Sequence, residues 1–220
     1  MQSGINVFTS FGTNDIWFMA QAAWRTLMIS AVSIALGTLL GVICGWLLHE
    51  GRILAAVLLA PLLDAFRSVP LIIQLVLFYN FAPIIGLNLD PFASGVIVLT
   101  LYTAALVANV AQGGMQAVGV PMRRAARSLG MSYWQDLRYV VFPIGARAVF
   151  PSWVGVALGV MKDSALVSVL GYVELLRASQ ILITRTQEPL LIISIAGAFY
   201  FALSYPISRY AAKVEKRWVQ

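Results

Sequence analysis

The feature that most constrains this chain is an uncharged apolar run from Leu27 to Leu48. A helix crosses a bilayer with about 20 mostly apolar residues, because each residue adds 1.5 Å of rise, and this run is long enough. Gly37, Gly41 and Gly45 recur within it at every fourth position, which predicts a smooth face where a neighbouring helix approaches closely. The run therefore predicts a membrane-spanning helix.

The composition extends this prediction to the whole chain. Apolar residues make up 60% of the 220 residues and charged residues only 11%, whereas soluble domains carry about 25% charged residues. So much apolar surface excludes a soluble protein, and the same hydrophobicity excludes disorder. We expect an all-α integral membrane protein in a single domain, residues 1–220.

Four more spans follow from the other apolar segments. Residues 53–82 are too long for one straight span, and Pro70 favours a break near 67–70, so we expect the segment to begin along the interface and then turn into the membrane. Residues 92–110 and 139–161 are the third and fourth spans, and the fifth begins at Pro189. Residues 1–23 are expected to be a retained polar or interfacial segment, and residues 209–220 a basic tail.

The distribution of lysine and arginine predicts the orientation. Ten cationic residues lie on the side of the 49–52 turn, the 114–148 segment and the tail, against three on the other side: Arg25, Arg177 and Arg185. Because cytoplasmic loops are enriched in Lys and Arg, the N-terminus is expected outside, in the periplasm, and the C-terminus in the cytoplasm.

The cytoplasmic loop, residues 114–138, has a distinctive local pattern. Residues 121–130 predict a short helix that starts at Pro121 and stops at Gly130, and Ser132 can cap a second helix near Tyr133. We call these two helices the knob. Its arginines favour an acidic rim on a partner protein; on this pattern alone, a basic loop anchored to lipid head groups is an equal alternative.

A resemblance supports the first interpretation. Ala125-Ala126, Gly130, Val140, Phe142 and Pro143 resemble, at their spacing, the EAA motif of membrane subunits of bacterial ABC importers. Residues 67–74, 112–114, 162–166 and 174–175 are similar, in order and spacing, to the polar amino-acid permease family within that group. The resemblance covers roughly residues 22–208.

The resemblance implies a type I ABC importer permease fold, with five transmembrane helices and a cytoplasmic coupling helix. It implies partners as well: cytoplasmic ATPase subunits that bind ATP and Mg²⁺, a second permease subunit, a periplasmic solute-binding protein and an amino-acid-like solute, in the bacterial inner membrane. Nucleic acid is not among the expected partners. The implied coupling residues lie on the knob: Arg123, Arg124, Ala125, Ala126 and Gly130.

The chain departs from the family pattern at three positions. Arg124 replaces the glutamate of the motif, and Asn109 and Gln112 stand where the family usually has Glu and Arg. These departures indicate either the divergent half of a heterodimer or a different cargo. We favour the first, in which a sister chain rather than a second copy of this chain is the other permease subunit.

Charged residues inside spans need a partner or a water-filled path, because each costs at least about 2.5 kcal/mol on insertion scales. Asp64 and Arg67 are three residues apart, so we expect a structural ion pair on one helical face. Lys162 has two equal interpretations: it faces the carboxylate of an amino-acid cargo, or it forms a buried pair with Glu174 or with the partner chain.

Four further polar residues complete the candidate substrate pathway. Gln74 and Asn109 offer both donors and acceptors and so suit a zwitterion that must be bound and released. Ser164 and Glu174 belong to the same candidate group. Hydrogen bonding between helices is the alternative role for all four.

The sequence argues against an enzyme. His49 is the only histidine and Cys44 the only cysteine, so the usual catalytic or metal-binding sets cannot assemble, and the sequence has no phosphate-binding loop of the G-x-x-x-x-G-K-[ST] type. We therefore expect no cofactor or metal on this chain and ATP hydrolysis on a separate subunit. The chain is expected to be a permease subunit of an ABC importer; the alternative is an ion-coupled carrier or channel that works without an ATPase.

Overall fold

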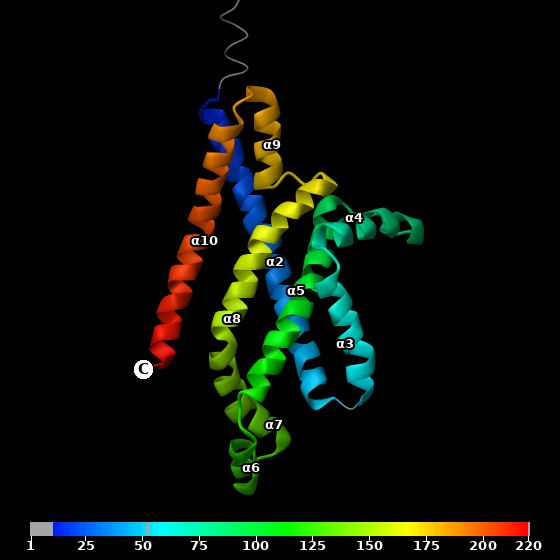
Figure 1. Cartoon of the computed structure of the whole chain (residues 1–220), viewed down its shortest axis with the longest axis vertical. Helices are drawn as coiled ribbons and strands as arrows, with labels where there is room; N and C mark the ends of the chain where they lie inside the picture. Colours follow the sequence, from blue (N-terminus) through cyan, green and yellow to red (C-terminus); the bar gives the residue numbers. More distant parts are fainter. Residues whose placement is uncertain (1–10, 52, 220) are drawn as a thin grey trace, which may run out of the picture.

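The computed structural model describes residues 11–51 and 53–219, and within these ranges all regular secondary structure is helical (Figure 1). The long helices form an elongated bundle, and the two short helices of the knob project from one end of it. The elements in chain order are α2 (Thr13–Glu50), α3 (Ile53–Ser68), α4 (Leu71–Phe81), η1 (Ala82–Ile85), α5 (Pro91–Gln116), α6 (Val120–Ser128), α7 (Tyr133–Asp136), η2 (Leu137–Val141), α8 (Phe142–Asp163), η3 (Ser164–Leu170), α9 (Leu175–Thr186) and α10 (Pro189–Val219).

The first helix is longer than its apolar run. We expected the span to begin at Leu27, but α2 already begins at Thr13, so residues 13–23 are helical and continuous with it. Asp15 stabilises this start, because its carboxylate accepts a hydrogen bond from Gly12 N at 2.9 Å, as an acidic residue in the first turn of a helix can. Of the expected N-terminal segment, residues 1–10 lie outside the described residues.

The second apolar segment is broken where Pro70 predicted. α3 and α4 meet at an angle of 106°. Pro70 has no N–H to continue the ladder, and Gln74 Nε2 instead donates to Phe66 O and Val69 O, both at 2.7 Å. The expected order of the two halves is wrong: α3 runs alongside the bundle, and α4 turns away from it (Figure 1).

Four helices of the described chain are long and apolar enough to cross a membrane, and the bent α3–α4 pair makes a fifth span if it is counted as one. α2, α5, α8 and α10 provide the four. α8 starts after a π-helical turn, η2, and α10 continues without a break through the basic tail. The five predicted spans therefore correspond to these helices, and the start of α2 and the end of α10 point to opposite ends of the bundle (Figure 1).

The core lies where α2 meets the later helices. One apolar cluster, which includes Ile29, Leu75 and Leu99, joins α2, α4, α5, α8 and η3. A second, which includes Met19 and Leu175, joins α2 to α9 and α10. α2 therefore contributes to the core over much of its length, and α9 packs beside its first turns at the end opposite the knob (Figure 1).

Candidate functional site

The knob consists of α6 and α7, and local sequence rules explain its shape. Gly130 lies between the two helices with φ of 83°, a left-handed conformation that glycine adopts without strain. Ser132 Oγ accepts a hydrogen bond from Gln135 N, and Gln135 Oε1 accepts one from Ser132 N at 2.8 Å, which forms a capping box. The predicted pair of helices, with its glycine stop and its serine cap, is confirmed.

A partly buried charge network, centred on the buried Asp136, holds α6 in place. Arg123 Nε donates to Asp136 Oδ2 at 3.0 Å, and Arg123 Nη2 lies 3.0 Å from Glu50 Oε1 at the end of α2. Burial alone would lower the pKa of Arg123, but the hydrogen bonds and charges of Asp136 and Glu50 outweigh it and raise that pKa. Arg123 is therefore charged, and it joins α6, α7 and α2 through one guanidinium group.

An aromatic contact connects the knob to α2 a second time. Trp46 Nε1, one turn before the end of α2, donates to the Tyr133 hydroxyl at 2.8 Å. The Trp46 and Trp134 rings lie 6.0 Å apart, and the Arg127 guanidinium lies 5.7 Å from the centre of the Tyr133 ring. Two short helices of this length would be unstable alone, so these contacts and the Arg123 network set their position.

The outer face of the knob is cationic and apolar. Arg124, Ala125 and Gly130 are exposed, and Leu129 is 83% exposed at the tip. Asp136, by contrast, is fully buried against Arg123 and has no exposed charge. An exposed leucine beside an unneutralised arginine is typical of a protein-docking surface rather than of a solvent-facing loop.

The predicted coupling residues therefore divide into two groups. Arg124, Ala125 and Gly130 lie on the exposed face, while Ala126 is buried and Arg123 binds its own chain. The sequence interpretation missed Leu129 as an exposed residue, although an apolar residue directly before a glycine stop in a polar loop is a usable signal.

The five candidate pathway residues do not form one site. Gln74 closes the α3–α4 bend through its amide N–H groups. Asn109 is exposed on the knob half of α5, and Lys162 is exposed at the opposite end of α8 (Figure 1). A single small cargo therefore cannot contact both Asn109 and Lys162 in this arrangement.

Ser164 and Glu174 belong to a buried polar cluster instead. Glu174 is fully buried at the start of α9, where its carboxylate accepts hydrogen bonds from Leu176 N at 2.9 Å and Arg177 N at 2.7 Å. Tyr200 OH donates to the same carboxylate at 3.2 Å. Burial raises the pKa of Glu174, and these hydrogen bonds oppose that effect. Glu174 is thus the N-cap of α9, and its hydrogen bond from Tyr200 on α10 is of the helix-to-helix kind considered as the alternative role.

The suggested pair between Lys162 and Glu174 is not formed. Within residues 11–51 and 53–219, no ion pair joins the two side chains, because the Glu174 carboxylate is fully occupied by the donors of α9 and Tyr200. The ion pair expected between Asp64 and Arg67 is present, in the last turn of α3 before the bend. The other two interpretations of Lys162, a cargo contact and a contact with a partner chain, stay open.

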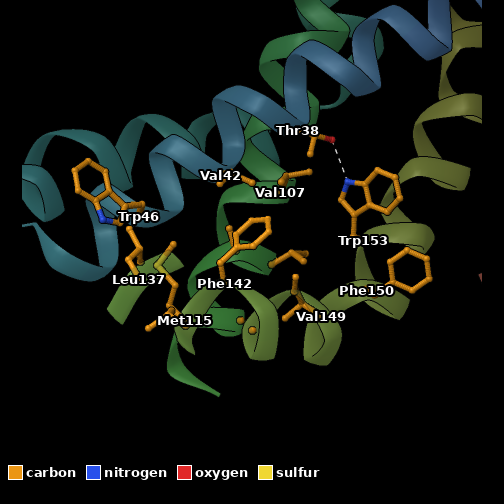
Figure 2. A pocket seen from close by; sticks show the side chains of 16 residues that line it. Thr38, Val42, Trp46, Val107, Met115, Leu137, Phe142, Val149, Phe150 and Trp153 are labelled. Carbon is orange, nitrogen blue, oxygen red and sulfur yellow. Dashed lines mark hydrogen bonds between the residues drawn. The ribbon is translucent and has the colours of Figure 1, made fainter. Parts of the chain in front are cut away.

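An apolar cavity of about 310 Å³ lies between α2, α5 and α8 (Figure 2). Phe142, Val149 and Trp153 line one side of it, and Trp153 Nε1 donates to Thr38 Oγ1 across it at 3.0 Å. No charged side chain lines the cavity, so it has no partner for either charge of a zwitterion. In the part of the chain that the structure describes, no group of three or more His, Cys, Asp or Glu side chains could bind a metal ion.

The comparison with known families identifies the fold and the general function. Residues 37–220 match the family described as binding-protein-dependent transport system inner membrane component. The chain belongs to this family. As a member it is an integral membrane permease subunit of an ABC importer, and permease subunits of this family are not themselves enzymes.

Curated relatives extend the match to nearly the whole chain. The glutamine transport system permease protein GlnP of Escherichia coli strain K12 is 27% identical over 213 residues, which cover 94% of this permease and 97% of the relative. The probable glutamine ABC transporter permease protein GlnP of Bacillus subtilis strain 168 is 30% identical over 215 residues, with the same coverage of 94% and 97%. The resemblance to the polar amino-acid permeases is thus confirmed.

Solved structures agree with the fold. The crystal structure of an amino acid ABC transporter with histidines contains a chain 28% identical to this permease, with a TM-score of 0.82 and coverage of 91% of this chain and 94% of that chain. The MetNI methionine ABC transporter, in inward-facing conformations, matches with 21% identity, a TM-score of 0.79 and coverage of 94% and 99%. At 21% identity the second match supports the fold alone.

Proposed function

We propose that this permease subunit imports a polar amino acid or a similar small zwitterion through the inner membrane of a bacterium, by alternating access driven by a separate ATPase. The glutamine permeases named among its relatives support this class of cargo. Because the chain has no phosphate-binding loop, ATP and Mg²⁺ bind to the ATPase subunits.

The observation that carries the proposal is the braced, exposed face of the knob. Leu129 and Arg124 face outward, while Arg123 and Tyr133 fasten the same two helices to α2. A docking element that transmits force must be both accessible and stiffly attached, and the knob has both properties. We assign Leu129 to an apolar floor and Arg124 to an acidic rim of the ATPase groove.

The proposed orientation puts the knob in the cytoplasm. The cationic residues of α6, of η2 and of the last part of α10 lie toward the knob end of the bundle, which supports this orientation (Figure 1). α9, at the opposite end, then faces the periplasm and the solute-binding protein.

A second permease subunit covers the exposed face of α8. Along that helix Arg147, Ser152, Gly155 and Lys162 are exposed, although they lie in a span. Charged and small residues are unfavourable toward lipid, so this face meets a water-filled pathway or another subunit. The unusual Arg124, Asn109 and Gln112 favour a sister chain as that subunit.

The first experiment separates the proposal from an ion-coupled carrier. The complex of this permease with its sister subunit and ATPase is reconstituted in proteoliposomes, and uptake of L-glutamine is measured with the solute-binding protein outside. We expect uptake only with ATP on the knob side and none with an ion gradient alone. Uptake driven by the gradient without ATP would contradict the proposal.

Docking is tested with matched variants at the tip of the knob. Leu129→Asp should abolish copurification of the ATPase, whereas Leu129→Met, which keeps the apolar volume, should preserve it. Arg124→Glu should weaken the same interaction by about tenfold, because the charge toward an acidic rim is reversed. Equal binding by the Asp and Met variants would show that Leu129 does not dock.

The cargo contact of Lys162 is tested by kinetics. If Lys162 binds the carboxylate of the cargo, Lys162→Met should lower the uptake rate at limiting cargo by about tenfold, which corresponds to one charged hydrogen bond. Lys213→Met, in the exposed last part of α10, is the control and should leave uptake unchanged. Normal uptake by the Lys162 variant would assign Lys162 to the contact with the partner subunit.

A further inference from the structure

Both ends of α2 are fastened by polar contacts to elements that meet other proteins in the proposed assembly. At the knob end, Glu50 Oε1 lies 3.0 Å from Arg123 Nη2, and Trp46 Nε1 donates to Tyr133 OH at 2.8 Å. The two contacts are one helical turn apart, so they fix both the position and the rotation of the knob relative to α2.

The other end of α2 is fastened to α9. Asp15 Oδ2 lies 2.5 Å from Arg185 Nη2, near the end of α9. Thr26 Oγ1 accepts a hydrogen bond from Leu175 N at 3.1 Å, at the start of α9, and Thr26 is fully buried. α9 is therefore attached to α2 at both of its own ends.

The helix between these contacts is suited to rigidity. α2 contains 38 residues and no proline, so it is about 57 Å long at 1.5 Å per residue. α3, α8 and α10 each contain an interior proline, and η2, a π-helical turn, separates the knob from α8. Prolines and π-helical turns are common sites of helix bending. Neither α2 nor α5 has one in its interior, so α2 is a stiffer connection from the knob to the opposite end than α8.

Close packing on α5 stiffens α2 further. A Cβ on Gly41 would lie 2.8 Å from Ala104 O, and one on Gly45 would lie 2.6 Å from Ala108 O. The two backbones are thus in direct contact, and the short distances leave no room for α2 to slide along α5. We therefore expect the helix pair to move as one body.

We propose that α2 is a rigid strut that couples the position of α9 to the position of the knob, so that docking of the solute-binding protein at α9 is relayed to the ATPase. This inference rests on the proposed function, which supplies the two docking partners. The outward face of α9 carries Arg177, Gln180 and Thr184 beside the exposed Ile181, which gives the binding protein a cationic surface with one apolar residue to contact. Asp15, Thr26, Trp46 and Glu50 are positioning residues in this scheme.

The test softens α2 in the middle without touching either end. Leu39 and Leu40 are 62% and 40% exposed. The double variant Leu39→Gly/Leu40→Gly lowers helix propensity there, and Leu39→Ala/Leu40→Ala removes the same side chains but preserves the helix. ATP hydrolysis by the complete reconstituted transporter is measured without the binding protein and with it, in the presence of L-glutamine.

We expect the Gly pair to reduce the stimulation of ATP hydrolysis by the binding protein at least about fivefold, which is the lower end of the usual coupling between two sites. Hydrolysis without the binding protein should be unchanged. The Ala pair should keep the stimulation of the wild type. Equal stimulation in the Gly and Ala pairs overturns the strut and leaves the proposed function intact. A wild-type complex that shows no stimulated hydrolysis overturns the proposed function and the strut with it.

A second set of variants covers the case in which the Gly pair does not assemble. Asp15→Asn, Arg185→Gln and the double variant form a mutant cycle on the contact between α2 and α9. We expect each single change to reduce the stimulation, and the double variant to be no worse than the worse single variant, because one contact is lost in all three. Additive losses would overturn the role of this contact in the relay.

Discussion

α5 and α10 are both long apolar helices, but the chain covers them very differently. In the apolar 18-residue stretch of α5, 56% of the residues are buried by the rest of the chain, whereas in that of α10 only 11% are buried. α5 packs its small residues against α2 and α8, while α10 presents Leu190, Phe201 and Tyr205 outward. The helices around α5 thus form a scaffold whose packing the chain completes by itself. The apolar surface of α10, by contrast, needs lipid or another subunit to cover it.

The contrast is sharpest between glycines. On α2, any side chain at Gly41 would clash with the backbone of α5, but on α8 nothing lies within 4 Å of a Cβ built on Gly155. Glycine therefore serves contact within the chain on α2. At Gly155 of α8 it leaves an open face, which fits an interface or a pathway.

The largest expected effect comes from breaking the scaffold. Gly41→Leu should destabilise the subunit by about 3 kcal/mol or more, because the clash is with a backbone carbonyl that cannot move aside. Gly155→Leu should leave the stability of the fold within about 0.5 kcal/mol and reduce only the association with the second permease subunit. Thermal unfolding of the purified subunit in detergent measures the first effect and copurification the second; equal unfolding temperatures for the two variants would contradict the comparison.

A smaller loss of stability is expected within the knob. There Arg123 points inward and binds its own chain, whereas Arg124 points outward. Arg123→Ala leaves Asp136 buried without its main partner, and breaking a buried pair in this way costs about 3–5 kcal/mol. Amide hydrogen exchange in residues 120–136 should therefore become faster, and the ATPase should no longer copurify. Arg124→Ala is the exposed control and should leave the exchange rates unchanged. Equal protection in the two variants would show that Arg123 does not brace the knob.

The smallest expected effect concerns pH and the cluster around α9. Burial raises the pKa of Glu174 above its ordinary value of 4.5, so the folded chain binds this proton more tightly than the unfolded chain. The contribution of Glu174 to stability is therefore full below pH 4.5 and decreases as the pH rises through the raised pKa. Glu174→Gln should flatten the dependence of the melting temperature on pH between 4 and 7; the same slope in the variant and the wild type would contradict this assignment.

Local features of the fold were predictable from the sequence, because their causes lie within a few residues. Pro70 breaks α3 from α4, Gly130 ends the first knob helix, and Ser132 caps the second. The glycine repeat of α2 predicted a close helix contact, and Gly41 has one with α5. Each of these follows from the chemistry of a few neighbouring residues.

Features that depend on distant residues were not predictable. The start of α2 was missed because Asp15 looked like part of a polar segment, whereas its partner, Arg185, lies 170 residues away. Arg123 looked like a docking residue because its two carboxylate partners, Glu50 and Asp136, come close only in the folded chain. The substrate pathway was the least predictable part. Gln74 and Glu174 form hydrogen bonds with distant groups of their own chain, which a linear pattern does not reveal.

The docking of the knob on an ATPase is tested most directly by identifying what Leu129 touches in the membrane. Leu129→Cys, in a Cys44→Ala background, is labelled with a photoactivatable maleimide in native membranes, irradiated and analysed by mass spectrometry. If the knob docks into an ATPase, Leu129→Cys should form a cross-link to an ATPase subunit and be labelled only from the cytoplasmic side. A cross-link to lipid alone, or labelling from the periplasm, would contradict it.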